Sequence, residues 1–286
     1  MIIDGKKIAS EIQEEIKTVI QNLAERPPCL AVILIGEHPA SQIYVRRKIQ
    51  ACVAVGIRSI KQELPATISE ENLLLEIEKL NQNPEIDGIL VQLPLPSHIN
   101  SALITHHINP DKDVDGFHPY NVGQLLIGES KGFFPCIPLG IKVLLERTGI
   151  ELSGKQALII GRSNIVGKPM AALLIESHAT VTIAHRYTQN LKQLCLLADI
   201  LIVAIGQPKF IKADMVKEGS VVIDVGINKV EDPTQKNGYQ IVGDVDFKNV
   251  APKCSYISPV PGGVGPMTIA MLLHNTLLSY QKRFFP

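Results

Sequence analysis

A strand-to-helix turn constrains the fold of this chain more than any other segment. Apolar residues 157–160 run directly into Gly161, and a polar turn then leads to Gly167-Lys-Pro169. A short apolar run ended by glycine is typical of a buried parallel strand, and Pro169 fits the first turn of a helix. The N–H groups at a helix N-terminus attract anions, so the turn is a candidate phosphate-binding site. The alternative is an ordinary connection between a strand and a helix.

Two known phosphate-binding motifs nearly fit this turn. A P-loop has a shorter gap before its Gly-Lys pair and then Ser or Thr, whereas this chain has Pro169, which argues against nucleoside-triphosphate chemistry. The dinucleotide fingerprint is also incomplete, because Ser163 stands at the position of its second glycine. Other segments must therefore decide what the turn does.

The composition is that of a globular protein with a substantial core. The chain has 286 residues, 45% of them hydrophobic, which suits one large or two modest domains. Its 28 basic and 28 acidic residues balance, so we expect neither nucleic acid nor a membrane as a partner. The five scattered cysteines form no C-x-x-C pair and predict free thiols without a metal site. With no leader-like start and no apolar run of membrane length, we expect a cytoplasmic protein.

Strand and helix patterns alternate along the first half of the chain, which predicts a parallel sheet. The expected elements are an amphipathic helix at 6–25, a buried strand at 29–35, helices at 41–55 and 70–80, and a second buried strand at 88–93.

From Gly154 the alternation starts again, with strands expected at 157–160, 180–184, 200–204 and 221–225, and helices at 168–177 and 190–197. The fold class is therefore α/β with two domains. The first is an N-terminal α/β domain, residues 1–139, and the second a Rossmann-like doubly wound domain, residues 140–266. We expect the stretch 118–140 to carry the hinge and the C-terminal helix, 267–286, to pack back on the first domain.

Tyr44 and Lys48 lie four residues apart on the second expected helix, so both project from one face. Cys52 continues that face, which is therefore not fully solvated. Because desolvation favours the neutral form of an amine, Lys48 is a candidate proton carrier. The alternative is that it belongs to a basic surface cluster with Arg46 and Arg47.

Polar residues also stand near the end of the strand 88–93. Gln92 lies close to its carboxyl end, where open α/β sheets bind ligands, so it either satisfies backbone groups or points into a site. Asp113 and Asp115 form an Asp-x-Asp-Gly turn that lacks the further ligands of a calcium loop. Either one of them holds the amidine-like edge of a heterocycle, or both simply form the turn. His118 has no second ligand at helical spacing, so no metal is expected.

The segment 258–267, Ser-Pro-Val-Pro-Gly-Gly-Val-Gly-Pro-Met, has the most unusual composition in the chain. Its glycines allow close backbone approaches, and its prolines stiffen it. Since a linker is rarely both stiff and rich in glycine, we favour a loop that contacts a ligand.

Seven motifs together resemble a known family. They are Tyr44-x-x-x-Lys48, Val91-Gln-Leu-Pro-Leu95, Lys112-Asp-Val-Asp-Gly116, Gly161-Arg-Ser-x-x-Val-Gly-x-Pro169, Asp224-Val-Gly-Ile-Asn228, Gly243-Asp-Val245 and Pro259-Val-Pro-Gly-Gly-Val-Gly-Pro-Met-Thr268. In this order they resemble the bifunctional methylenetetrahydrofolate dehydrogenase/methenyltetrahydrofolate cyclohydrolase family, in its single-polypeptide bacterial form. The resemblance covers nearly the whole chain.

The resemblance implies an enzyme of folate one-carbon metabolism that serves purine biosynthesis. NADP-dependent oxidation of 5,10-methylenetetrahydrofolate gives the methenyl form, and hydrolysis of that form gives 10-formyltetrahydrofolate. A folate in a cleft between two domains, NADP on the second domain and a homodimer are also implied. The alternatives are a dehydrogenase that has lost cyclohydrolase activity and a non-catalytic NADP-binding protein on the same fold. No large further domain is present, so formyltetrahydrofolate synthetase activity is not expected.

The family's residue roles map onto this chain. Lys48 is similar to the catalytic proton-transfer lysine, Gln92 to the residue that hydrogen-bonds and tunes it, and Asp115 to the pterin-binding aspartate. Tyr44 completes the catalytic set. The implied substrate-binding residues are Tyr44, Lys48, Val91, Gln92, Leu93, Asp115, Pro261, Gly262, Gly263 and Val264. The implied cofactor-binding residues are Gly161, Arg162, Ser163, Ile165, Val166, Arg186, Gly206 and Ile227. One departure is Ile137, where the family usually has threonine.

The choice of cofactor can be inferred from the residues themselves. NAD sites place an acid at the end of the second strand, about 20 residues past the first glycine. Here that strand ends in Thr182-Ile-Ala-His185-Arg186, without an acid. Arg162 and Arg186 are instead placed to meet a ribose 2′-phosphate, which favours NADP.

Overall fold

The structure is a computed structural model of the chain and describes residues 1–129, 131–235 and 238–284. It divides into two compact units. The Lys48 unit consists of Ser10–Cys136 and Ile269–Pro286, and the Gly161 unit consists of Met1–Ala9 and Ile137–Thr268. The domain limits, hinge and cleft named above stay predictions.

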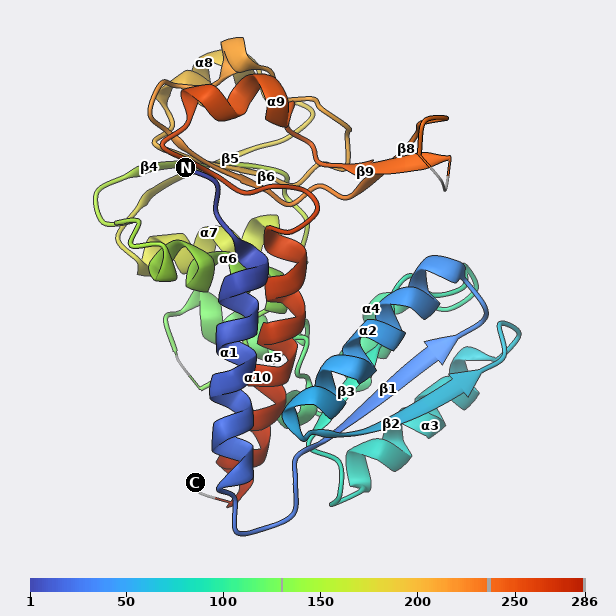
Figure 1. Cartoon of the computed structure of the whole chain (residues 1–286). Helices are drawn as coiled ribbons and strands as arrows, with labels where there is room; N and C mark the ends of the chain where they lie inside the picture. Colours follow the sequence, from blue (N-terminus) through green and yellow to red (C-terminus); the bar gives the residue numbers. More distant parts are fainter. Residues whose placement is uncertain (130, 236–237, 285–286) are drawn as a thin grey trace. The chain divides into compact units, whose positions relative to one another are not determined.

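The sheet of the Lys48 unit contains β1 (Cys29–Ile35), β2 (Arg58–Leu64) and β3 (Gly88–Val91), all parallel, in the order β2-β1-β3 (Figure 1). The middle strand β1 is buried along its whole length, as its unbroken apolar sequence predicts. The edge strand β2 was not predicted, because its charged residues leave no apolar run and only every second or third side chain is partly buried. Beyond β3, Asp113 pairs with Ile89 in an isolated parallel bridge.

The helices of the Lys48 unit confirm the predicted alternation. They are α1 (Gly5–Gln21), which begins in the Gly161 unit, α2 (Pro39–Val55), α3 (Glu70–Gln82), α4 (Ser101–His107), η1 (Pro110–Lys112) and α5 (Pro119–Leu126). Gly56 ends α2 with φ 88°, a left-handed conformation that favours glycine. Ser69 caps α3 by accepting a hydrogen bond from the Asn72 N–H.

The last helix, α10 (Val264–Phe284), begins three residues earlier than predicted, so part of the Pro-Gly-rich segment is helical. Its C-terminal half is tied to the Lys48 unit by hydrogen bonds. The Ser279 hydroxyl donates to the carbonyls of Asp87 (2.6 Å) and Asp111 (2.8 Å). The Asn275 amide donates to the carbonyl of Val114 at 2.9 Å. Since the acceptors at Asp111 and Val114 are backbone carbonyls, these bonds fix the backbone of the 111–114 segment.

The Gly161 unit contains a parallel sheet in the order β10-β7-β6-β4-β5. Its strands are β4 (Gln156–Ile160), β5 (Thr180–Ala184), β6 (Ile200–Val203), β7 (Val221–Asp224) and β10 (Tyr256–Ile257). The other elements are α6 (Cys136–Arg147), α7 (Gly167–Glu176), α8 (Leu191–Leu197), η2 (Ala213–Met215), the antiparallel hairpin β8 (Asn228–Glu231) and β9 (Tyr239–Val242), α9 (Phe247–Val250) and η3 (Ala251–Lys253).

The strand order of this sheet indicates the edge at which a ligand is expected. The chain places β5 on one side of β4 and β6 on the other, so the winding direction reverses at β4. Open α/β sheets bind ligands at such a reversal, outside the carboxyl ends of the strands. Gly161 follows β4 directly and therefore lies at this point. Among the described residues, no helix has both the length and the apolar character needed to cross a membrane.

Candidate functional site

Lys48 lies on the buried face of α2. Ser41, Val45 and Cys52 are buried and recur at helical spacing, and Lys48 occupies the intervening position on the same stripe. Its side chain is partly buried, whereas Tyr44 beside it is 38% exposed. The flanking Arg46 and Arg47, one residue off the stripe, are exposed. Lys48 is thus distinct from the surface cations next to it.

Gln92 orients the lysine amine. Its side-chain N–H donates to the Leu93 carbonyl at 2.7 Å, which turns the amide oxygen the other way. Lys48 Nζ donates to that oxygen at 3.1 Å. Gln92 follows β3 directly, and its backbone N–H still pairs with the Ile33 carbonyl of β1 at 2.9 Å. The lysine therefore ends at the carboxyl edge of the sheet.

The 112–116 segment divides into scaffold and site. Lys112 Nζ donates to the carbonyls of Leu80 (3.0 Å), Asn81 (2.7 Å) and Asn83 (2.8 Å), so it caps the C-terminus of α3. This role was not predicted, since nothing in the local sequence places Lys112 near α3.

Asp113 is also part of the scaffold. Its carboxylate is buried and accepts the His118 N–H at 2.7 Å and the Asn121 side-chain N–H at 2.9 Å. Burial raises the pKa of Asp113, and the hydrogen bond from Asn121 opposes that rise. One oxygen of this carboxylate, Oδ2, is thus held by two neighbouring protein groups.

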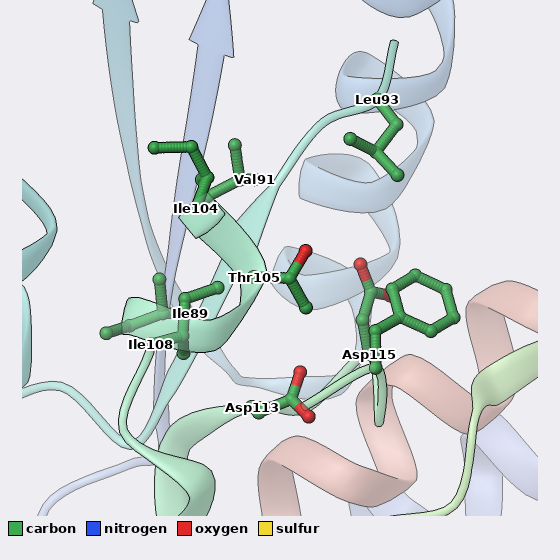
Figure 2. Close-up of a pocket in the computed structure, with 9 residues that line it drawn as sticks. Ile89, Val91, Leu93, Ile104, Thr105, Ile108, Asp113 and Asp115 are labelled. Carbon is green, nitrogen blue, oxygen red and sulfur yellow. The ribbon is translucent and has the colours of Figure 1, made fainter. Parts of the chain in front are cut away.

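Asp115 faces a small cavity of about 10 Å³ that Val91, Leu93 and Asp113 also line. Figure 2 shows Ile89, Val91, Ile104 and Ile108 together on one side, with Thr105 and the two aspartates away from them and Leu93 apart from the other apolar residues. Burial raises the pKa of Asp115, while the charge on Lys48 acts in the opposite direction. A cavity of this size holds at most one water molecule, so any larger ligand of Asp115 binds outside it.

The turn after β4 is built for a close backbone approach. Gly161 has φ 128°, and a Cβ there would lie 2.3 Å from the Ala204 carbonyl oxygen. A Cβ on Gly167 would lie 2.1 Å from the Gly161 carbonyl oxygen. The Ser163 hydroxyl accepts the N–H of Val166 at 3.1 Å and so holds the turn that leads into α7. The turn is therefore closely packed although the second glycine of the fingerprint is missing.

Arg162 and Arg186 come together although 24 residues separate them in sequence. The two strands are neighbours, with Ile160 opposite Ala184, so the residues that follow them meet at one edge. Both guanidinium groups lie over the ring of Tyr187, with centroid distances of 5.9 Å for Arg162 and 4.7 Å for Arg186. Sequence reasoning missed Tyr187, whose signal was an aromatic residue directly after the second arginine.

Two buried aspartates, Asp224 and Asp244, support the turns at the carboxyl edge of the same sheet. Their structural role was not predicted from the sequence. Asp244 is fully buried and accepts the N–H groups of Ile205 (2.7 Å) and Gly206 (2.9 Å) in the turn after β6. Asp224 is also buried and accepts the Asp244 N–H at 2.9 Å. Burial raises the pKa of Asp224 to about 6, although its backbone hydrogen bonds oppose the rise. Gly206, a predicted cofactor residue, is thus held by Asp244.

The remaining predicted residues lie in the Gly161 unit. Ile165 and Ile227 are 37% and 53% exposed, and Val166 is buried. Pro261 is exposed, whereas Gly263 and Val264 are buried, and a Cβ on Gly5 would lie 2.0 Å from the Gly263 carbonyl oxygen. This contact explains the glycine at position 5. A Cβ on Gly263 would lie 2.7 Å from the Pro259 carbonyl oxygen, so packing within the segment accounts for this glycine, and ligand contact by the segment stays a prediction. Gly262, with φ 113°, adopts a conformation that favours glycine.

Within the described ranges, no cluster of His, Cys, Asp and Glu is suited to holding a metal ion. The fold and the two sites define a two-domain α/β protein with a dinucleotide-type sheet in one unit and a lysine–carboxylate site in the other.

Family models match both parts of the chain. One described as tetrahydrofolate dehydrogenase/cyclohydrolase, catalytic domain, matches residues 3–115, and one described as the NAD(P)-binding domain of the same family matches residues 135–284. The chain therefore belongs to the tetrahydrofolate dehydrogenase/cyclohydrolase family.

Individual relatives are similar over the full length. The bifunctional protein FolD of Protochlamydia amoebophila is 73% identical, with 99% of this chain and 98% of that protein covered. The crystal structure of the bifunctional enzyme FolD from Campylobacter jejuni is 50% identical, with a TM-score of 0.95 and 99% of both chains covered. The Trypanosoma brucei enzyme, solved with NADP and an inhibitor, is 39% identical, with a TM-score of 0.95 and coverage of 100% of this chain and 99% of that one.

Proposed function

We propose that the chain is a bifunctional enzyme of folate one-carbon metabolism. It oxidises 5,10-methylenetetrahydrofolate to 5,10-methenyltetrahydrofolate with NADP and then hydrolyses the product to 10-formyltetrahydrofolate. Membership of the family supports both activities, and the full-length similarity to bifunctional relatives supports their presence in one chain. The observation that carries the proposal is the hydrogen bond from Lys48 to Gln92 beside the partly buried Asp115.

The residues of the Gly161 turn fit a dinucleotide. Gly161 and Gly167 let the backbone of the turn pack closely against itself and against Ala204. We propose that a pyrophosphate binds to the N–H groups at the start of α7, which this turn presents. Arg162 and Arg186 supply positive charge at the edge where a ribose 2′-phosphate belongs, in place of the acid of an NAD site. Bound NADP supplies the hydride acceptor for the dehydrogenase step. The chain contributes binding and orientation to that step.

Lys48 moves the proton in the cyclohydrolase step. Water attacks the methenyl carbon, and ring opening requires a proton to reach a folate nitrogen, so one group must accept and donate protons at this position. Gln92 holds the lysine amine by a neutral acceptor, which fixes its direction without adding a second negative charge next to Asp115. Tyr44, one helical turn before Lys48, completes the catalytic set that we propose.

Asp115 binds the pterin. A carboxylate in a partly buried site pairs strongly with the two parallel N–H groups of an amidine-like edge, because both bonds are charge-assisted. The Val91 and Leu93 side chains, which line the same cavity, supply apolar contact beside it. We further propose Pro261–Val264 as folate-contacting and Gly206 and Ile227 as cofactor-contacting residues.

The finer assignments are proposals of the same kind. We propose a homodimer, a cytoplasmic location and a role in supplying purine biosynthesis, and functional domains at residues 1–139 with 267–286 and at residues 140–266. The free, mostly buried cysteines of the structure agree with a reducing compartment. Light scattering of the purified protein tests the dimer, since a monomer mass contradicts it.

The test of function is spectrophotometric. Purified protein is mixed with 5,10-methylenetetrahydrofolate and NADP, and NADPH and methenyl absorbance are followed separately. We expect NADPH to form without lasting accumulation of the methenyl product. Absence of NADPH formation contradicts the proposal, and accumulation of the methenyl product identifies a dehydrogenase without cyclohydrolase activity.

The Lys48→Met variant tests the proton carrier. Hydrolysis of added methenyltetrahydrofolate should fall by at least about 100-fold, the usual contribution of a positioned acid–base group. Arg47→Met is the matched control, because Arg47 is a cation on the same helix but exposed. We expect it to keep the activity, and full activity in Lys48→Met shows that the proton-transfer role is misassigned.

A further inference from the structure

Tyr187 is an exposed aromatic residue for which the proposed reaction gives no role. It follows β5 by three positions, and 65% of its surface is exposed. Its backbone is nevertheless fixed, because its N–H donates to His185 Nδ1 at 3.2 Å and the Thr188 N–H donates to the His185 carbonyl at 2.8 Å. The His185 ring stands edge-on to the tyrosine ring at 6.1 Å. The backbone that carries the ring is therefore fixed at the carboxyl edge of the sheet.

Two cations share this ring. Arg162 approaches it from the turn after β4, and Arg186 precedes it in sequence. Two guanidinium groups repel each other, and in the described part of the chain neither forms an ion pair with a carboxylate. The negative face of an aromatic ring attracts a cation and so offsets part of this repulsion. Tyr187 thus keeps two positive groups near one another without neutralising either of them.

Two unneutralised guanidinium groups at one position favour a doubly charged phosphate group. Without the ring, the two long arginine side chains would be ordered only when the ligand binds. The entropy lost at that moment would reduce the affinity for the ligand. If the ring holds the arginines before binding, part of this entropic cost is removed. The gain in affinity applies only to a ligand that carries the additional phosphate.

We propose that Tyr187 is a specificity-determining positioning residue, whose ring holds Arg162 and Arg186 ready for the 2′-phosphate of NADP. The proposal rests on the proposed use of NADP. It predicts that Tyr187 strengthens binding of adenosine ligands with a 2′-phosphate and has little effect on those without one.

The test compares two probes by calorimetry. Adenosine 2′,5′-bisphosphate carries the 2′-phosphate, and 5′-AMP lacks it. In Tyr187→Ser we expect the bisphosphate to bind about 10-fold more weakly, from the loss of two cation–ring contacts, while binding of 5′-AMP changes less than about twofold. Tyr187→Phe keeps the ring and should bind both probes like the parent.

Three results overturn the proposal. Equal weakening of both probes in Tyr187→Ser shows that the ring stacks on adenine, and unchanged binding shows that it has no role. Loss in Tyr187→Phe equal to that in Tyr187→Ser assigns the effect to the hydroxyl.

A double-mutant cycle tests whether Tyr187 acts through the arginines. In an Arg162→Ala, Arg186→Ala background, Tyr187→Ser should produce no additional loss of bisphosphate affinity, and an additional loss of about 10-fold contradicts the positioning role. Failure of the cofactor assignment itself looks different, because the parent protein would then bind the bisphosphate no more tightly than 5′-AMP. That result rejects both the cofactor assignment and the role of Tyr187.

Discussion

Each unit of the molecule contains a pair of aspartates with little or no exposure to solvent, and the two pairs differ in what surrounds the carboxylates. In the Gly161 unit, Asp224 accepts the N–H groups of Gly226, Asp244 and Val245, all at 2.9 Å. Asp244 accepts two backbone N–H groups and the Asn228 amide. In the Lys48 unit both aspartates line one small cavity, but Asp113 Oδ2 accepts two N–H groups, whereas Asp115 lies within the electrostatic influence of Lys48.

The difference teaches how to separate scaffold from site among buried acids. A carboxylate saturated by backbone N–H groups fixes the loops that donate them, and it has no acceptor left for a ligand. The glycines around the Asp224–Asp244 pair show how tight this arrangement is. A Cβ on Gly226 would lie 2.2 Å from Asp244 Oδ1, and one on Gly243 would lie 1.9 Å from Asp224 Oδ2. Packing against the two carboxylates therefore explains why positions 226 and 243 are glycine, without any contact to a ligand.

The largest effect that we expect from this comparison is on stability as a function of pH. Burial raises the pKa of Asp224 from 3.8 to about 6. Between these values the folded protein binds more protons than the unfolded chain, so the free energy of unfolding falls as the pH rises from about 4 to about 6. The loss from this group amounts to roughly 3 kcal/mol. Urea unfolding at a series of pH values should show that Asp224→Asn removes this decline.

Asp199→Asn is the control with the opposite sign. The hydrogen bond from Lys217 lowers the pKa of Asp199, so that carboxylate stabilises the fold above its unfolded pKa and loses the effect as the pH falls. Its replacement should lower the stability at neutral pH. If Asp224→Asn and Asp199→Asn change the pH profile in the same direction, Asp224 is not a carboxyl destabilised by burial.

The next effect separates site from scaffold within the Lys48 unit. Asp115→Asn should lower kcat/KM for methylenetetrahydrofolate by about 100-fold, because it removes a charge-assisted pair of hydrogen bonds to the pterin. The same change should keep or raise the melting temperature at pH 7, since burial raises the pKa of Asp115 and so disfavours its charged form in the folded state.

Asp113→Asn is the matched change at the scaffold position. It replaces the charge-assisted hydrogen bonds that Asp113 Oδ2 accepts from His118 and Asn121 by weaker neutral ones, so we expect a loss of about 1–3 kcal/mol in the free energy of unfolding. If Asp115→Asn is instead the destabilised variant and keeps its activity, the assignment of site and scaffold to these two aspartates is reversed.

Much of the fold was predictable, because apolar runs and helix caps are local signals. The strand 29–35 agrees with β1 at both ends, and Gly56 ends α2 as expected. The edge strand β2 and the hairpin of β8 and β9 were not predicted, because each buries little surface and carries polar residues. Helix α5 lies in a stretch expected to carry only the hinge, and its Pro119 start is equally compatible with a turn.

The spacing of residues along the sequence predicted less of the site than the resemblance to the folate enzyme family did. Periodicity placed Lys48 on a partly buried face, but its contact with Gln92 joins residues 44 positions apart, and only the folded sheet brings them together. Tyr187 meets Arg162 for the same reason, since the contact depends on the pairing of β4 with β5. Long-range contacts of this kind leave no local pattern, whereas a turn such as Gly161 to Gly167 does.

The smallest effect tests the first residue of the 112–116 segment. Lys112→Met removes three hydrogen bonds to carbonyls at the end of α3, and we expect the free energy of unfolding to fall by about 1–2 kcal/mol. Activity should stay within about twofold of the parent, because Lys112 caps a helix and does not face the cavity that Asp115 lines. Lys79→Met is the matched control, since Lys79 is exposed, lies in the last turn of the same helix and pairs with Glu76. It should change stability by less than about 0.5 kcal/mol. A large loss of activity in Lys112→Met at unchanged stability would place Lys112 in the site and remove the division of this segment into scaffold and site.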